Sequence, residues 1–112
     1  KLTDADLVFT GEGRLDSQSL YGKTTVGVAR LAKRHGVPIV ALAGSLGEGH
    51  EALYGEGIDA ALSITDEPMT LEEASAEAER LIANAAERAL RLMAVGAKLR
   101  DKGLELRLDV DL

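Results

Sequence analysis

Three short apolar runs, each closed by glycine or by polar residues, constrain the fold of this chain more than any other feature. The runs are ADLVFT (5–10), PIVALA (38–43) and IDAALSI (58–64). Continuous apolar runs of this length are typical of parallel strands, because such strands are buried on both faces. We therefore expect three buried strands.

Helical patterns separate and follow these runs. TTVGVARLAKRHG (24–36) is apolar at helical spacing, GEGHEALYGEG (47–57) suits a short helix that ends at a glycine, and Thr70 with Glu73 forms a capping-box signature for a long helix to about Val95. The order β-α-β-α-β-α predicts a three-layer α/β fold on a parallel sheet, like part of a Rossmann or flavodoxin-like domain.

A sheet of three strands is thin, and its open edges invite pairing. The chain begins with Lys1, and a strand-like run starts almost at once. We expect a piece of a longer chain, completed by the rest of that chain or by a second copy through a sheet edge or the tail. We assign 1–96 to the α/β portion and 97–112 to a tail. Within the tail, GLELRLDVDL (103–112) alternates apolar and polar residues, which predicts either an extra edge or pairing strand or a disordered end.

Composition narrows the class of function. The 112 residues carry a net charge of −6, which argues against nucleic acid as a partner. There is no cysteine, hence no disulfide or thiol chemistry, and one Phe, two Tyr and no Trp leave an aliphatic core. No apolar run approaches the roughly 18 residues of a membrane span. We expect a cytoplasmic protein with no membrane partner.

The segment Gly-Lys-Thr-Thr resembles the end of a phosphate-binding loop. Gly22, Lys23 and Thr24 match the end of G-x-x-x-x-G-K-[ST], but the first glycine should stand where the chain has Ser17. The mismatch argues against such a loop and favours a helix start with Thr24 or Thr25 as its cap. Lys23 remains a candidate phosphate contact, since a lysine beside a helix N-terminus can neutralise an anion.

The stretch TGEGRLDSQ (10–18) follows the first strand, at the end where open α/β sheets place ligand sites. Glu12, Arg14 and Asp16 offer two carboxylates and one bidentate cation, and Gly11 and Gly13 allow a ligand to approach closely. The set fits a Mg²⁺–phosphate site or a site for a hydroxy-acid carboxylate. The alternative is a surface ion pair of small energy.

AGSLGEG (43–49) follows the second strand. Gly44, Ser45 and Gly47 could offer backbone N–H groups to an anion, although the simpler interpretation is a turn with Ser45 as a helix cap. We expect His50 to be a solvent-facing helix residue and His35 to be a cation at a helix C-terminus. Neither has a carboxylate cluster nearby, so a zinc site is not indicated.

These motifs together resemble the C-terminal part of the bacterial glycerate kinases of the first type, which phosphorylate glycerate with ATP. The similarity runs from about Ala5 to Gly96, and the blocks TGEGRLDSQSLYGKT and ALAGSLG are the specific part. The resemblance implies a phosphotransferase that uses ATP and Mg²⁺ on glycerate. It matches Glu12, Arg14, Asp16, Gln18 and Lys23 to positions of the family motif. Together with the residue arguments above, it predicts the site: the catalytic residues are Glu12, Asp16 and Lys23, the substrate or phosphate contacts are Gly11, Gly13, Arg14, Gln18 and Ser45, and Asp16 is the Mg²⁺ ligand.

Members of that family are several times longer, with the active site in a cleft between two α/β domains. The N-terminal half is absent here, and the alternating tail is not a family feature. We therefore expect the chain alone to be inactive. The alternative from another class is a non-catalytic α/β module for assembly or dimerisation.

Overall fold

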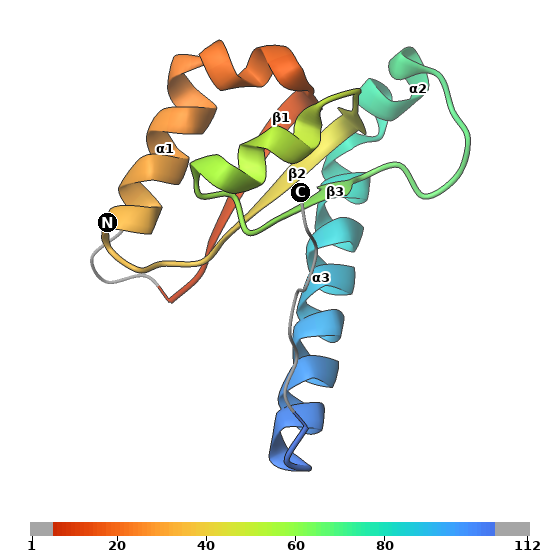
Figure 1. Ribbon diagram of the computed structural model, residues 1–112. Helices are drawn as coiled ribbons and strands as arrows, with labels where there is room; N and C mark the ends of the chain where they lie inside the picture. The colour runs from red at the N-terminus through yellow and green to blue at the C-terminus, as the bar shows by residue number, and fades with distance from the viewer. Residues whose placement is uncertain (1–5, 105–112) are drawn as a thin grey trace.

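The centre of the computed structural model is a parallel sheet of three strands in the order β1-β2-β3. The strands are β1 (Val8–Leu15), β2 (Ile39–Leu46) and β3 (Ala60–Ser63), as Figure 1 shows. The structure describes residues 6–104, except for the side chains of residues 20 and 23–25. The strand order confirms the expected parallel α/β fold.

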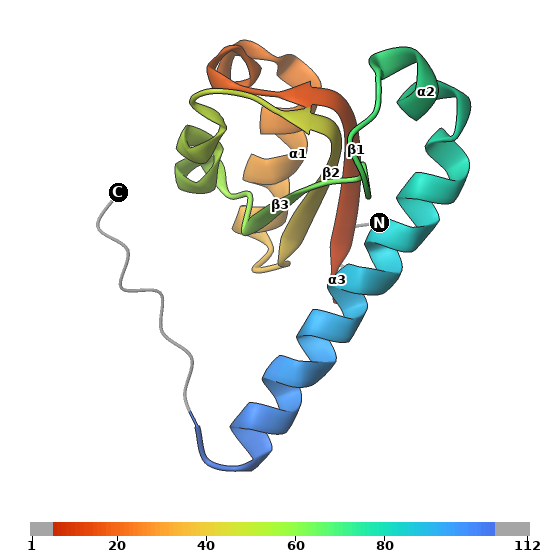
Figure 2. The same cartoon turned by 90° about the vertical axis from the view of Figure 1, so that its right-hand side faces the viewer.

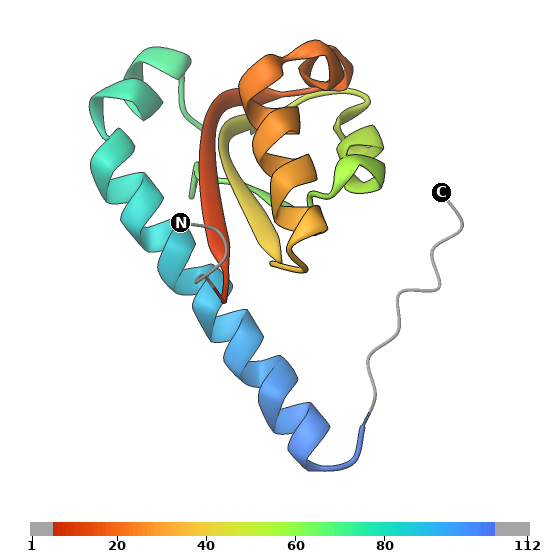
Figure 3. The same cartoon turned by 90° about the vertical axis from the view of Figure 1, so that its left-hand side faces the viewer.

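Helices cover both faces of the sheet, which gives three layers. One face carries α1 (Lys23–Arg34) and η3 (His50–Glu56), and the other carries α2 (Leu71–Ala76) and α3 (Ala78–Asp101) (Figure 2). Figure 3 shows η3 beside α1 on their shared face. The cores on the two faces are aliphatic, as expected. The α1 face buries Leu15, Val26, Ala29, Ala41, Ala43, Leu53 and Ile58, and the α3 face buries Val40, Leu42, Ile64, Ala74, Leu81 and Ala85.

The first two strands are longer than their apolar runs predict. β1 continues through Gly11–Arg14, which we expected to be a loop, and β2 continues three residues past Ala43. Gly13 and Gly44 lie at this extension, where the two backbones approach closely. A Cβ on Gly44 would lie 2.6 Å from the carbonyl oxygen of Gly13. The absence of a side chain on Gly44 therefore lets strand pairing continue through a polar, glycine-rich segment.

A 3₁₀ helix, η2 (Ser17–Tyr21), connects β1 to α1, and Asp16 is its N-cap. α1 begins at Lys23 with Gly22 as its N-cap and no side-chain cap, so the expectation that Thr24 or Thr25 caps this helix is wrong. The connection after β2 is also a 3₁₀ helix, with Gly49 as its N-cap, and Ser45 lies within β2, so Ser45 does not cap it.

The C-terminal helical segment starts where the sequence predicts. Thr70 and Glu73 form the capping box, with the Glu73 N–H donating to Thr70 Oγ1 at 3.1 Å and the Thr70 N–H donating to Glu73 Oε1 at 2.8 Å. The segment breaks at Glu77 into α2 and α3, and α3 continues past the expected end near Val95 to Asp101.

The C-terminal half of α3 extends beyond the sheet (Figure 2). Apolar side chains on this half remain exposed, for example Leu92 at 65% and Val95 at 51%. Most of the alternating tail, 105–112, lies outside the described residues, so its predicted strand is not addressed. Within residues 6–104, no helix combines the length and apolar character that a membrane crossing requires.

Candidate functional site

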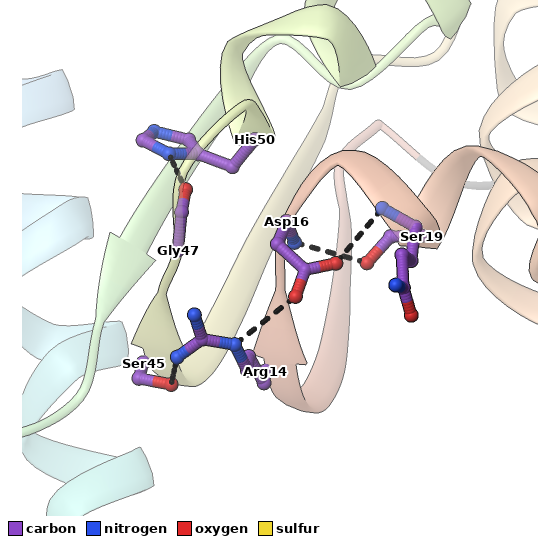
Figure 4. Close-up of polar contacts among 7 residues, drawn as sticks. Arg14, Asp16, Ser19, Ser45, Gly47 and His50 are labelled. Carbon is purple, nitrogen blue, oxygen red and sulfur yellow. Dashed lines mark hydrogen bonds and ion pairs between the residues drawn. The ribbon is translucent and has the colours of Figure 1, made fainter.

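The candidate site lies where β1 and β2 end. In the parallel register Arg14 of β1 stands opposite Ser45 of β2, and Leu15 stands opposite Leu46. Asp16 follows β1 directly. Because parallel strands direct their carboxyl ends to one edge of a sheet, polar residues from separate sequence motifs meet there. Figure 4 shows this edge.

Arg14 connects the two strand ends. Its Nε donates to Asp16 Oδ2 at 3.0 Å, and its NH1 donates to Ser45 Oγ at 3.3 Å (Figure 4). The two contacts orient the guanidinium group, while 59% of the side chain stays accessible to solvent. A guanidinium has five N–H donors, and these two bonds use two of them. The group is thus both oriented and able to take an anion from solution.

Asp16 is held by backbone and side chain together. Its Oδ1 accepts from the Gln18 N–H at 2.9 Å, and its own N–H donates to Ser19 Oγ at 3.1 Å. The Arg14 side-chain hydrogen bond, followed by the Gln18 N–H, holds the pKa of the Asp16 carboxyl below its ordinary value of 3.8. Asp16 is therefore ionised at neutral pH. An ionised carboxylate with a lowered pKa suits cation binding better than proton transfer.

The loop after β2 packs against this pair. The Gly47 N–H donates to the Leu15 carbonyl at 2.6 Å, and the Ser17 N–H donates to the Glu48 carbonyl at 3.0 Å. A Cβ on Gly47 would overlap the guanidinium of Arg14 and lie 2.9 Å from Asp16 Cβ. A side chain at position 47 would therefore displace the Arg14 guanidinium or the loop, and glycine avoids this.

His50 makes a contact that the sequence did not predict. We expected a solvent-facing helix residue, but only 20% of its side chain is exposed, and its Nδ1 lies 2.9 Å from the Gly47 carbonyl oxygen (Figure 4). Nδ1 also lies 3.0 Å from Glu51 Oε1. The spacing of Gly47 and His50 carries no recognised motif, so only the folded loop reveals the contact.

The remaining predicted residues do not all join this cluster. Glu12 forms no hydrogen bond or ion pair with Arg14 or Asp16 in the described structure. By strand alternation it shares a face with Val8, which packs toward α1. Gln18 contributes its backbone N–H. Lys23 begins α1, but its side chain lies outside what the structure describes.

Gly11 and Gly13 line a separate pocket on the α3 side of the sheet, with a volume of about 290 Å³. Its walls are mostly apolar and come from the sheet, α2 and α3. The other residues that line the pocket are Glu12, Leu42, Gly44, Ile64, Leu71, Ala74, Ser75, Ala78 and Ile82. No group of three His, Cys, Asp or Glu residues stands close enough to hold a metal ion in the described part of the chain. A metal ion bound to a carboxylate of the described residues would therefore need further ligands from outside them, from substrate or from water.

Comparison with known proteins finds relatives over most of this chain. The model of the glycerate kinase family matches residues 1–94. Glycerate kinase from Halalkalibacterium halodurans is 54% identical over 83 residues, which are 74% of this chain and 22% of that protein. Glycerate kinase from Bacillus subtilis is 47% identical over 96 residues, or 86% of this chain and 24% of that protein. Glycerate 2-kinase from Escherichia coli is 40% identical over 95 residues, which are 85% of this chain and 25% of that protein.

A solved structure shares the fold. The crystal structure of a protein described as glycerate kinase 2 from Salmonella typhimurium LT2 superposes with a TM-score of 0.60 at 40% identity. The match covers 88% of this chain and 24% of the other. The chain thus spans about a quarter of the length of the relatives it matches.

Proposed function

The chain belongs to the glycerate kinase family, and from that premise we propose that it supplies one wall of the active site of a kinase that transfers phosphate from ATP to glycerate. The observation that carries the proposal is the Arg14 guanidinium, oriented between Asp16 and Ser45 at the carboxyl ends of two adjacent strands. Because the chain spans about a quarter of its relatives, the activity belongs to the complete polypeptide, and this chain alone is inactive.

Arg14 is the anion-binding group in this proposal. Both substrates carry anionic groups, the phosphates of ATP and the carboxylate of glycerate. A guanidinium binds either through paired N–H donors, and orientation by neighbours lowers the entropy lost when it does so. Ser45 and Asp16 provide that orientation. With 59% of its side chain exposed, Arg14 is accessible to a ligand from solution.

Asp16 is the candidate Mg²⁺ ligand. Its lowered pKa keeps it ionised, and Mg²⁺ in kinase sites commonly takes one or two carboxylates together with substrate phosphates and water. One carboxylate beside an arginine therefore fits a shared Mg²⁺–phosphate site. When bound, Mg²⁺ would offset negative charge on the transferred phosphoryl group. Asp16 contributes a fixed negative charge at this edge, and its bond to Gln18 N–H holds the carboxylate in place.

Glu12 and Lys23 complete the proposed catalytic set, with Gly11, Gly13 and Gln18 as substrate contacts. Phosphoryl transfer depends mainly on positioning and charge stabilisation, so each residue needs only to reach the reacting groups in the closed cleft. Glu12 would orient the glycerate hydroxyl, and Lys23 would offset phosphate charge.

The test uses the complete polypeptide with ATP, Mg²⁺ and D-glycerate, and follows ADP release. Arg14→Gln and Asp16→Asn should lower kcat/KM about a hundredfold, the size of effect seen when one positioned group is removed from a charge-stabilising site. Arg30→Gln is the matched control. Arg30 is also exposed and paired, with Glu56 at 2.6 Å, but it lies on α1 away from the strand ends. It should leave the rate at the wild-type level.

Three outcomes would contradict the proposal. Wild-type turnover in the Asp16→Asn, Glu12→Gln and Lys23→Met variants would remove the site assignment. An equal loss of rate in Arg14→Gln and Arg30→Gln would show that the effect is general destabilisation and not loss of an anion contact. ADP release by the 112-residue chain alone would refute the claim that it is inactive without the remaining polypeptide.

A non-catalytic role in assembly is the second candidate, and the exposed apolar half of α3 favours it. Leu90 is 51% exposed and Leu92 is 65% exposed in the described structure. Size-exclusion chromatography of the chain with and without residues 103–112 tests this role. A monomer in both cases would argue against pairing through the tail.

A further inference from the structure

The glycines of β1 leave open space over the α3 face of the sheet. Gly11 and Gly13 lie two residues apart on one face of the strand, the face on which Phe9 packs toward α3. A Cβ on Gly13 would meet no described atom within 4 Å, and one on Gly11 would meet only the Leu42 carbonyl at 3.9 Å. Neither glycine has a positive φ. The described fold therefore does not itself require glycine at either position.

Glycine within a strand costs roughly 0.5–1 kcal/mol relative to alanine. Two such glycines stand beside space that side chains could fill. This arrangement indicates that a ligand occupies the space. The space is the pocket of about 290 Å³ between the sheet and the start of α3. This volume is at or below the lower end of the range of about 300–1,000 Å³ for small-molecule sites, so it would hold one ring system and not a whole nucleotide.

The pocket adjoins the anion site through the backbone. Its floor includes Gly13 and Gly44, and the next residues along the chain are Arg14 and Ser45. Neighbouring Cα atoms are about 3.8 Å apart, so the pocket and the Arg14–Ser45 contact lie at consecutive positions of both strands. The glycines contribute only backbone to the pocket, its aliphatic lining includes Leu42, Ile64 and Ala78, and Glu12 and Ser75 also line it. A mostly apolar pocket suits the faces of a planar ring, whereas glycerate is small and polar.

We propose that this pocket receives the purine base of the nucleoside triphosphate whose phosphates extend toward Arg14. The proposal rests on the kinase function above and adds the location of the base. It assigns Gly11 and Gly13 to the nucleotide and not to glycerate. It also makes Ala78 of α3 a contact of the base, because Ala78 lines the pocket. A larger side chain at this position would narrow the pocket from the helix side.

The experiment measures steady-state kinetics of the complete polypeptide, with adenosine as a competitor. Gly13→Val and Ala78→Leu should raise KM for ATP about tenfold or more, the effect of a misplaced methyl group or two in a fitted pocket. KM for D-glycerate should stay unchanged, and competition by adenosine should weaken in parallel. Gly27→Val is the control, because Gly27 on α1 also has no described atom within 4 Å of its Cβ position. It should leave both KM values unchanged.

The outcomes separate this inference from the kinase proposal. If Arg14→Gln abolishes turnover while Gly13→Val and Ala78→Leu leave KM for ATP unchanged, the kinase proposal stands and the base lies elsewhere. Equal increases in both KM values would also overturn the inference. A lower urea midpoint for Gly13→Val with adenosine competition intact would show that another part of the complete polypeptide fills the pocket, and it would overturn the inference. Gly13→Ala, which adds one methyl group, then repeats the binding test in a less perturbed protein.

Discussion

The close approach of β1 and β2 at Gly13 and Gly44 gives a sharp test of the fold at the site. In Gly44→Ala, the new methyl group would lie 2.6 Å from the Gly13 carbonyl oxygen, 3.5 Å from its carbonyl carbon and 3.8 Å from its Cα. These are backbone atoms of a paired strand, so no side chain can turn away. Ordinary contact begins near 3.4 Å, and the two strands would have to separate by about 0.8 Å to reach it.

The magnitude follows from this displacement. Overpacking a tight site costs typically about 1–3 kcal/mol, and the gain of alanine over glycine in a strand returns roughly 0.5–1 kcal/mol. We expect Gly44→Ala to lower the free energy of unfolding by about 1–2 kcal/mol. With a urea dependence of about 1–3 kcal/mol per molar, the midpoint should fall by about 0.3–2 M. Circular dichroism follows the transition.

Gly13→Ala is the matched control, because it makes the same chemical change on the partner strand. Its Cβ would meet no described atom within 4 Å, so the midpoint should stay unchanged or rise by the strand preference for alanine. Equal urea midpoints for Gly44→Ala and Gly13→Ala would refute the reasoning, because the close strand contact at Gly44 would then have no effect on stability. A lower midpoint for Gly13→Ala than for Gly44→Ala would refute the register itself.

Three further predictions concern stability. Thr70→Ala removes the hydroxyl that accepts from the Glu73 N–H and should lower the free energy of unfolding by about 1 kcal/mol in urea titrations, while Thr70→Ser retains it. Glu56→Gln breaks an exposed contact with Arg30 and should change stability by less than about 1 kcal/mol; a larger loss would show that this pair is not a screened surface pair. For Asp16, a pKa lowered in the folded state stabilises the protein above the ordinary value of 3.8, and this contribution is lost as pH falls through the folded pKa. The urea midpoint of the wild type should therefore exceed that of Asp16→Asn at pH 7 and converge with it in strong acid, and a constant difference at all pH values would contradict the ionic origin.

The layers of the fold could be predicted because their signals are local and redundant. The run PIVALA, now part of β2, is apolar at every position because a central parallel strand is buried on both faces. Thr70 and Glu73 indicate a helix start through hydrogen bonds between residues only three positions apart. Such patterns need no knowledge of distant parts of the chain.

Strand ends and the site geometry depend on pairing between distant segments. Glycine and charge in the stretch around Gly11–Asp16 favour a loop when they are considered alone, but pairing with β2 satisfies the backbone hydrogen bonds and extends the strand. Arg14 meets Ser45 across 31 positions of sequence. The residue types of the site could be proposed from the motif, whereas the contact between them follows from register.

Gly13 and Gly44 show why a glycine cannot be interpreted from sequence alone. Both follow an apolar run, and both precede a polar residue of the site. In the fold, Gly44 is needed because the neighbouring strand leaves no room for a Cβ, whereas the space above Gly13 is empty among the described residues. Two glycines opposite each other in one sheet thus have different reasons to be glycine. One substitution should change stability and the other should change binding, and this separation follows only from the register between β1 and β2.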